Sequence, residues 1–368
     1  MKAFLILEDG TVFTGTSIGS TKSVISEIVF NTSMTGYLEV LTDPSYAGQA
    51  VVMTYPLIGN YGVTPDMESA QPWPDGYIVR ELSRIPSNFR CQGTIQDFLK
   101  EHDIPGIAGI DTRALTKILR EKGTMNGMIT TDENYKLDEI LPQLHVYNTG
   151  NVVDKVTCCE KKVLKADGTE NTGAVGTGNK IAVYANGTLV KQYDVVIYGD
   201  INGEVTIYPA HTTAEEILSS DPDGIMLSNG PGDPKACTDI IKEVKKLYDS
   251  EVPIFAICLG HQLMALATGA DTYKLKYGHR GGNHPVKDLE TGRVYISSQN
   301  HGYAVDADSL DQTIAVPAFT NVNDGTNEGL KYTGKNIFTV QFHPEACPGP
   351  QDSSYLFDRF MDMMGGNK

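Results

Sequence analysis

Short apolar stretches alternate with helix-like stretches in the second half of the chain. Apolar runs typical of buried strands lie at 181–184, 205–208, 224–227 and 253–257, and helical patterns lie between them at 213–218 and 239–248. This alternation of strand and helix predicts βαβ units and therefore a parallel sheet. Because ligands bind at the carboxyl ends of the strands in such sheets, the residues that follow each strand are the first candidates for chemistry.

The first part of the chain has a β-rich pattern. An apolar run at 4–7, an acidic turn at 8–10 and a second run at 11–13 predict a β-hairpin. Further strands are expected at 24–30 and 50–54. The short strands and their turns predict a domain in which β structure dominates.

One helix in this part has clear ends. We expect it at Thr112–Lys122, because Asp111 can cap its start and Gly123 can stop it. From about 147 to 179, Gly, Thr, Asn, Lys and Asp dominate and apolar periodicity fades, which is typical of a linker. The predicted fold class is therefore α/β, with a mixed β-rich N-terminal domain at 1–147, a linker at 148–179 and a C-terminal domain with a doubly wound parallel sheet at 180–368.

Composition narrows the class of protein. A length of 368 residues with 40% hydrophobic content suits two ordinary cores. The net charge of −16 argues against binding to nucleic acid or to an anionic membrane, which both attract basic surfaces. No apolar run approaches ~18 residues, and the N-terminus reaches Glu8 and Asp9 too soon for a signal peptide. We therefore expect a soluble, cytoplasmic protein.

The cysteine and histidine pattern does not predict a metal site. The six cysteines show no CxxC spacing, so we expect neither a disulfide framework nor a zinc site. His279 and His284 lie in a Gly-rich loop, but no carboxylate or thiolate accompanies them at ligand spacing. No metal ligands are predicted in this chain.

Cys258 has the surroundings of a nucleophile. The apolar run that ends at Ile257 delivers it to a turn with small neighbours, Ala256 and Gly260, and a helical stretch follows at once. Free N–H groups and the positive end of the dipole at a helix start favour a thiolate and can hold an oxyanion. The pattern predicts a nucleophile elbow, which is a sharp strand-to-helix turn with the reactive side chain at its tip.

A base for this thiol is predicted near the end of the chain. The alternating run that starts at Phe338 ends in His343 and Glu345, and period two places these two side chains on one side of a strand. His343 can take the thiol proton, and Glu345 can orient the imidazole and stabilise its charged form. The predicted catalytic residues are Cys258, His343 and Glu345.

These motifs resemble those of a known family. Cys258-Leu259-Gly260-His261-Gln262 followed by His343-Pro344-Glu345 is similar to the class I (triad) glutamine amidotransferases, as is the segment 228–234, which resembles their oxyanion and glutamine-holding loop. Further segments resemble the small chain of glutamine-hydrolysing carbamoyl-phosphate synthetase in particular, at 31–37, 41–46, 55–62, 109–113, 278–285 and 298–303. The resemblance covers essentially the whole chain.

The resemblance implies roles for further residues. Backbone N–H groups of Leu259 and Gly232 would hold the oxyanion of a glutamine amide under attack. The glutamine-binding residues would be Ser45, Gly230, Gly232, Leu259, Gln262, Asn300, Gly302 and Tyr303. Ser45 comes from the first domain, which would also contact a partner, so the resemblance implies a class I glutaminase domain completed by that first domain.

A partner chain is implied as well. The sequence has no phosphate-binding loop of the GxxxxGK[ST] type, so ATP chemistry is expected elsewhere. The resemblance implies a large synthetase chain that receives ammonia from this chain and makes carbamoyl phosphate from bicarbonate and ATP, with magnesium, for arginine and pyrimidine synthesis. The expected assembly is a heterodimer, and no cofactor is expected in this chain.

Alternative functions stay open at the level of the sequence. The chain can serve another synthase, such as those of anthranilate or GMP, but this leaves the first 150 residues without a role. It can also be a stand-alone cysteine hydrolase of γ-glutamyl substrates, or a catalytically silent regulatory subunit. One segment, 184–200, departs from the family pattern, because 195–198 reads as a strand where a helix is expected.

Overall fold

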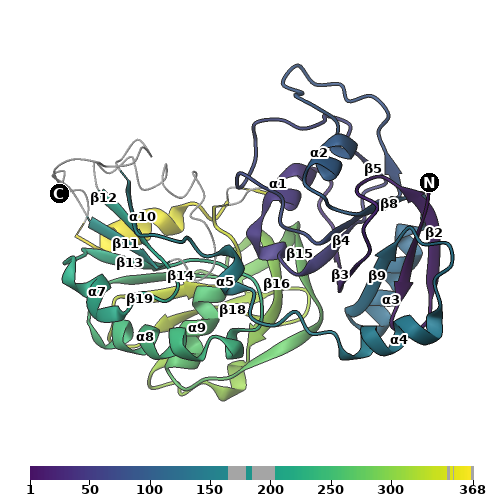
Figure 1. Cartoon of the computed structure of the whole chain (residues 1–368). Helices are drawn as coiled ribbons and strands as arrows, with labels where there is room; N and C mark the ends of the chain where they lie inside the picture. Colours follow the sequence, from purple (N-terminus) through teal and green to yellow (C-terminus); the bar gives the residue numbers. More distant parts are fainter. Residues whose placement is uncertain (165–179, 185–203, 346–348, 351, 366–368) are drawn as a thin grey trace. The chain divides into compact units, whose positions relative to one another are not determined.

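The computed structural model describes residues 1–164, 180–184, 204–345, 349–350 and 352–365 (Figure 1). The chain divides into two compact units, Met1–Gly150 with Lys276–Gly281, and Asn151–Leu275 with Gly282–Lys368. The two units have separate cores, and we describe each by itself. In the described residues, no helix is both long enough and apolar enough to cross a membrane.

The first unit is built on a closed β-barrel. Its strands are β1 (Lys2–Leu7), β2 (Val12–Ser17), β3 (Val24–Asn31), β4 (Gln49–Met53), β6 (Gly76–Ile78), β8 (Gly106–Ala108) and β9 (Met125–Thr130), in the order β1-β2-β8-β6-β4-β3-β9. Neighbours β3, β4, β6 and β8 are parallel and the remaining pairs are antiparallel. The antiparallel pair of β1 with β2 confirms the predicted hairpin.

Short elements surround the barrel. A separate two-stranded sheet joins β5 (Leu57–Ile58) to β7 (Glu81–Leu82), and the helices are α1 (Tyr37–Thr42), η1 (Pro44–Tyr46), α2 (Ile95–Glu101), α3 (Thr112–Lys122) and α4 (Leu137–Val146). Strand β3 is buried on both faces: Ile28 packs in one core cluster with residues of α3, and Val29 packs in another with residues of α1 and α2. The barrel core therefore anchors helices on two sides.

Helix α3 has the ends that the sequence predicted. Asp111 accepts a hydrogen bond through Oδ1 from the backbone N–H of Ala114 at 3.0 Å, and Gly123 follows the last turn with φ 104°. Leu115 and Leu119 are fully buried in the barrel core. The cap satisfies one of the free N–H groups at the helix start and so helps to fix this helix on the barrel.

The second unit contains a ten-stranded sheet. Its strands are β10 (Lys162–Leu164), β11 (Lys180–Tyr184), β12 (Glu204–Tyr208), β13 (Gly224–Leu227), β14 (Ile254–Ile257), β15 (Thr272–Asp288), β16 (Val294–Val305), β17 (Ala315–Asn321), β18 (Asn327–Tyr332) and β19 (Ile337–Val340), in the order β10-β12-β11-β13-β14-β19-β18-β17-β15-β16. Five neighbouring strands, β12-β11-β13-β14-β19, are parallel to one another, as predicted. The sheet as a whole is mixed, because four of its strand pairs are antiparallel. These are β10 with β12, β19 with β18, β18 with β17, and β17 with β15.

Helices cover both faces of this sheet (Figure 1). They are α5 (Val153–Val156), α7 (Ala214–Ser219), α8 (Thr238–Asp249), α9 (Leu259–Ala267) and α10 (Tyr355–Met363). Ile254 and Ala256 of β14 share a core cluster with α7, α8 and α9, whereas Phe255 and Ile257 share another with α10. This period-two alternation in a strand buried on both faces confirms the α/β class and the doubly wound arrangement.

Part of the predicted linker is structured. Within 148–179, α5 and β10 belong to the second unit, and β10 pairs with β12. The short apolar runs in these elements are too brief for periodicity to reveal them. Residues 165–179 lie outside the described residues, as do Cys347 and the predicted strand at 195–198 within the divergent segment. The five cysteines in the described residues are free thiols.

Replacing Asp111 with Ala should destabilise the first unit by about 1 kcal/mol, because the helix start loses its side-chain acceptor. Trp73 is the single tryptophan of the chain and lies in this unit, so its fluorescence in a urea titration reports on this unit alone. Asp111→Asn is the matched control, since Asn keeps an acceptor oxygen and should retain most of the stability. Equal urea midpoints for Asp111→Ala and wild type would show that the cap contributes nothing.

Candidate active site

Three neighbouring strands deliver the predicted catalytic segments to one sheet edge. Strand β14 pairs in parallel with β13 on one side and with β19 on the other. The segment 228–234 follows β13, Cys258 follows β14, and His343 lies shortly after β19. Because parallel strands end at the same edge, these segments converge, as the sequence predicted.

Cys258 occupies a strained turn between β14 and α9. Its backbone has φ 52° and ψ −106°, which side-chain-bearing residues rarely adopt. The Cys258 N–H donates to the carbonyl of Val340 on β19 at 2.8 Å, and the Gly260 N–H donates to the carbonyl of Ser228 at 3.2 Å. These bonds hold the turn in place from both neighbouring strands, and the geometry is that of a nucleophile elbow.

Gly260 is required at this elbow by close packing. A Cβ at this position would lie 2.4 Å from the carbonyl oxygen of Leu227, a backbone atom that cannot move aside cheaply. Ala256 lies within β14 and has no positive φ. A side chain is therefore tolerated at Ala256 and excluded at Gly260.

His343 and Glu345 form the predicted pair. His343 Nδ1 lies 2.7 Å from Glu345 Oε1, and both side chains are almost completely buried. The predicted reason for this pairing was wrong: β19 ends at Val340, and Pro344 and Glu345 lie in a turn. The backbone N–H of His343 donates to the backbone carbonyl of Ser298 at 2.9 Å. This bond fixes the position of His343, and the turn that follows brings the Glu345 carboxylate to its imidazole.

The environment favours a protonated His343. Burial opposes the charged form, but the Glu345 carboxylate and the Cys258 thiol outweigh it and raise the pKa of His343 well above its usual range. Nε2 of His343 is buried, and a side-chain interaction with Cys258 is among the causes of the raised pKa. With Nδ1 held by Glu345, Nε2 is the nitrogen left for exchange of a proton with the thiol.

Two backbone N–H groups in the segments that follow β13 and β14 have no partner within the described part of the chain. Leu259 is the first residue of α9, where N–H groups have no partner within the helix. Gly232 has φ 96°, in the left-handed region that glycine adopts without strain. Among the described residues, neither N–H donates a hydrogen bond, so both are available to an oxyanion.

Gln262 and His261 lie in the first turn of α9 and are buried, so they are not surface residues of this helix. The Gln262 amide donates to the carbonyl of Tyr303 at 2.8 Å and to Oε1 of Gln341 at 2.9 Å. His261 Nδ1 lies 2.7 Å from Thr339 Oγ1, and burial lowers the pKa of His261 to about 3. His261 is thus a neutral residue beneath the elbow, distinct from the His343 pair.

The other predicted glutamine-binding residues lie on two parts of the fold. Asn300, Gly302 and Tyr303 belong to β16, and the Cys258 thiol donates to the carbonyl of Asn300 at 3.7 Å. Gly230 follows β13 in the same loop as Gly232. Ser45 belongs to the first unit, where it is buried in η1, and its role in glutamine binding stays a prediction.

Comparison with known proteins agrees with this geometry. The family model described as carbamoyl-phosphate synthase small chain, CPSase domain, matches residues 5–129, and the model described as glutamine amidotransferase class-I matches residues 191–363. The carbamoyl phosphate synthase small chain of Listeria monocytogenes serotype 4b (strain F2365) is 50% identical over 100% of this chain and 98% of its own length. The chain belongs to the carbamoyl-phosphate synthase small-chain family.

Other members of this family are similar over the same extent. The carbamoyl phosphate synthase small chain of Clostridium perfringens (strain 13 / Type A) is 49% identical over 98% of this chain and 99% of its own. The carbamoyl phosphate synthase pyrimidine-specific small chain of Lactiplantibacillus plantarum is 46% identical over 100% and 97%. In this small chain, the second unit contains most of the residues that match the class I glutamine amidotransferase model.

The structure of this small chain shows three further residues that support the candidate site and that the sequence analysis did not predict. Ser298 supplies the carbonyl that positions His343, Thr339 contacts His261, and Gln341 accepts from Gln262. A polar residue within an apolar strand, such as Thr339 in β19, is a signal for a buried hydrogen-bond partner. Ser298 acts through its backbone, so its residue type gives no such signal.

Replacing Glu345 with Gln should lower the pKa of His343, because burial then opposes protonation without the carboxylate. Titration of the histidine C–H resonances by NMR measures this, with His343→Asn used to assign the resonance. The resonance of the buried His261 should be unaffected.

The same pair should make stability depend on pH. Since the folded-state pKa of His343 is raised, its stabilisation is fully present below the unfolded histidine pKa of ~6.5 and is lost as pH rises through the folded value. The difference in unfolding free energy between wild type and Glu345→Gln should therefore be largest at mildly acid pH, between the unfolded pKa values of ~4.3 for Glu and ~6.5 for His. A difference that grows as pH rises above ~6.5 would contradict this assignment.

Proposed function

We propose that this chain hydrolyses glutamine through a Cys258 thioester and passes the ammonia to a large synthetase chain that makes carbamoyl phosphate. The observation that carries the proposal is the buried arrangement of Cys258, at the strained elbow, with His343 and its carboxylate partner Glu345. Membership of the small-chain family supports the substrate and the partner.

The first half of the reaction forms a covalent intermediate. In the attacking form the proton of Cys258 is held on Nε2 of His343, and the Cys258 sulfur attacks the side-chain amide carbon of glutamine as a thiolate. The amide oxygen becomes an oxyanion held by the N–H groups of Leu259 and Gly232. His343 then protonates the departing nitrogen, the C–N bond breaks, and ammonia leaves a γ-glutamyl thioester on Cys258.

The second half restores the enzyme. His343 removes a proton from a water molecule that attacks the thioester carbon, and the same N–H groups hold the second oxyanion. The C–S bond breaks and glutamate leaves, while the proton on His343 returns to the sulfur. Glu345 keeps Nδ1 occupied throughout, so that Nε2 always faces the reacting atoms.

Substrate holding involves the predicted glutamine-binding residues. In this proposal Ser45, Gly230, Gly232, Leu259, Gln262, Asn300, Gly302 and Tyr303 surround the glutamine. Gln262 is fixed by Tyr303 and Gln341, so its side chain keeps one orientation. Such pre-ordering reduces the entropy lost on binding.

The partner completes the reaction sequence. Hydrolysis of glutamine alone yields only glutamate and ammonia, so an ammonia-consuming enzyme must follow. In this proposal the large chain combines the ammonia with bicarbonate and ATP, with magnesium, and the heterodimer acts in the cytoplasm for arginine synthesis, pyrimidine synthesis or both. The synthase chemistry lies in the partner, and this chain carries no cofactor.

Replacing Cys258 with Ser should reduce glutamine-dependent carbamoyl phosphate synthesis by about 10³-fold or more in the complex with a cognate large chain. Ammonium-dependent synthesis should be unchanged, because ammonium bypasses the thioester. In wild type, hydroxylamine should trap the thioester as γ-glutamyl hydroxamate, and Cys258→Ser should give none.

The alternatives predict other results in this assay. A silent regulatory subunit gives no hydroxamate in wild type. A stand-alone γ-glutamyl hydrolase forms hydroxamate from peptide substrates and supports no glutamine-dependent synthesis with the large chain.

Free chain should hydrolyse glutamine slowly, and addition of the large chain should accelerate it, since uncoupled hydrolysis wastes glutamine. Steady-state glutamate formation with and without the partner measures the effect. Cys258→Ser with the partner serves as the background control. Equal rates with and without the large chain would show that the partner does not control this site.

A further inference from the structure

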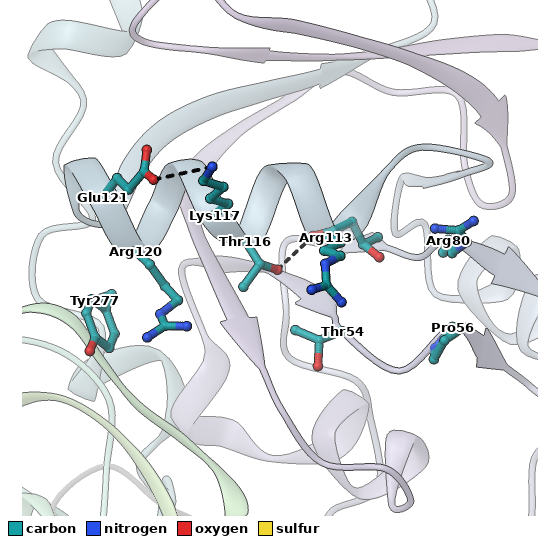
Figure 2. Close-up of a pocket in the computed structure, with 10 residues that line it drawn as sticks. Thr54, Pro56, Arg80, Arg113, Thr116, Lys117, Arg120, Glu121 and Tyr277 are labelled. Carbon is teal, nitrogen blue, oxygen red and sulfur yellow. Dashed lines mark hydrogen bonds and ion pairs between the residues drawn. The ribbon is translucent and has the colours of Figure 1, made fainter. Parts of the chain in front are cut away.

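The first unit contains a cavity of about 880 Å³ that the proposed chemistry does not use. Helix α3 forms one wall, the segment that follows β4, including Thr54, contributes another, and Arg80 and Tyr277 line the ends (Figure 2). All of its lining residues belong to the first unit, since residues 276–281 group with it. We call this cavity the α3 groove.

Positive charge dominates the α3 groove. Its lining includes Arg80, Arg113, Lys117 and Arg120 but a single carboxylate, that of Glu121, which lies 3.8 Å from the Lys117 ammonium. In the part of the chain that the structure describes, Arg80 and Arg113 form no ion pair, whereas Arg90 elsewhere in the unit pairs with Asp66 at 2.6 Å. A concentration of unneutralised arginines stands out in a chain of net charge −16.

The arginines form a row. Arg113 and Arg120 are seven residues apart on α3 and so lie about 10 Å apart along its axis. Figure 2 shows both side chains on the same side of the helix, Arg113 toward Thr54 and Arg120 toward Tyr277, over whose ring the Arg120 guanidinium lies at 6.0 Å. A small anion needs donors that converge on one point, whereas separated guanidinium groups suit several carboxylates along a chain.

Exposed apolar side chains adjoin this row. Tyr55 and Leu57 flank the groove residue Pro56 and are 39% and 37% exposed. Leu57 lies in β5, which pairs with β7 directly after Arg80. Arginine and tyrosine beside apolar side chains are enriched at the centres of protein–protein interfaces.

From these features we infer that the α3 groove docks an acidic segment of the large chain, whose carboxylates pair with Arg80, Arg113 and Arg120. This inference rests on the proposed function, because it takes the large chain as the partner. Nucleic acid, the other polyanion that such a row can attract, is disfavoured by the repulsion of a strongly acidic protein. The groove thus gives the small chain a charge-complementary contact in the unit that carries no catalytic cysteine.

The test is the affinity of full-length chain for the cognate large chain, measured by calorimetry at low and high salt. The double variant Arg113→Glu/Arg120→Glu should weaken binding at least about 10-fold at low salt and reduce its salt dependence. Arg113→Gln/Arg120→Gln, which introduces no negative charge, should weaken it less. The control Lys100→Glu/Lys136→Glu makes the same charge change on exposed residues of the same unit and should stay within about twofold of wild type.

Three results would overturn the inference. If wild type binds and the arginine variants bind equally well, the groove is not the docking site although the proposed function stands. If wild type does not bind the large chain, the partner and the groove assignment both fail. If the isolated chain binds inorganic phosphate and Arg113→Gln/Arg120→Gln abolishes this without weakening the large-chain complex, the groove is a small-anion site. The urea midpoint of Trp73 fluorescence, which reports on the first unit, should equal wild type in the isolated variants and shows that this unit is folded.

Discussion

The parallel pairing of β14 with β13 and β19 is the constraint on which the catalytic arrangement depends. Cys258 is held in a positive-φ conformation because its N–H bonds to Val340 of β19 and the next turn bonds to Ser228 after β13. A residue in this conformation costs about 1–3 kcal/mol, which packing of the surrounding sheet must offset. The central strand is buried on both faces, with Phe255 and Ala256 in different core clusters, so the elbow stands on a strand that is packed on both sides.

Burial has opposite consequences for the two histidines near the elbow. His261 has a neutral hydroxyl, that of Thr339, as its hydrogen-bond partner, and its pKa falls to about 3. His343 has the Glu345 carboxylate and the Cys258 thiol, and its pKa rises well above the usual range despite equal burial. The difference lies in the charge of the neighbours, because a low-dielectric site strengthens an ion pair and penalises an isolated charge. One histidine is thus suited to proton transfer and the other to structural support.

Much of the fold followed from local patterns. The hairpin of β1 and β2, the helix from Asp111 to Gly123 and the parallel strands around β14 were all predicted, because turn chemistry, capping and apolar runs act over short distances. The antiparallel strands β15–β18 and the pairing of β10 were not predicted. The pairings of β15 with β17 and of β10 with β12 join segments far apart in sequence, and such pairing leaves no periodic signal in a single chain. The connections from β17 to β18 and from β18 to β19 are short, and the sequence analysis did not predict these hairpins.

By itself the sequence predicted Cys258 as nucleophile, His343 as base and Glu345 as its carboxylate, because the residue types and their places after apolar runs suit that chemistry. Tertiary structure decided how His343 and Glu345 meet: they pair in a turn anchored by Ser298, beyond the end of β19. It also decided that Gly260 must lack a side chain, that Gln262 is fixed by Gln341, and that the arginines of α3 share a groove with Arg80. These features arise from contacts between segments distant in the chain, and their geometry exists only once the sheet and the barrel are assembled.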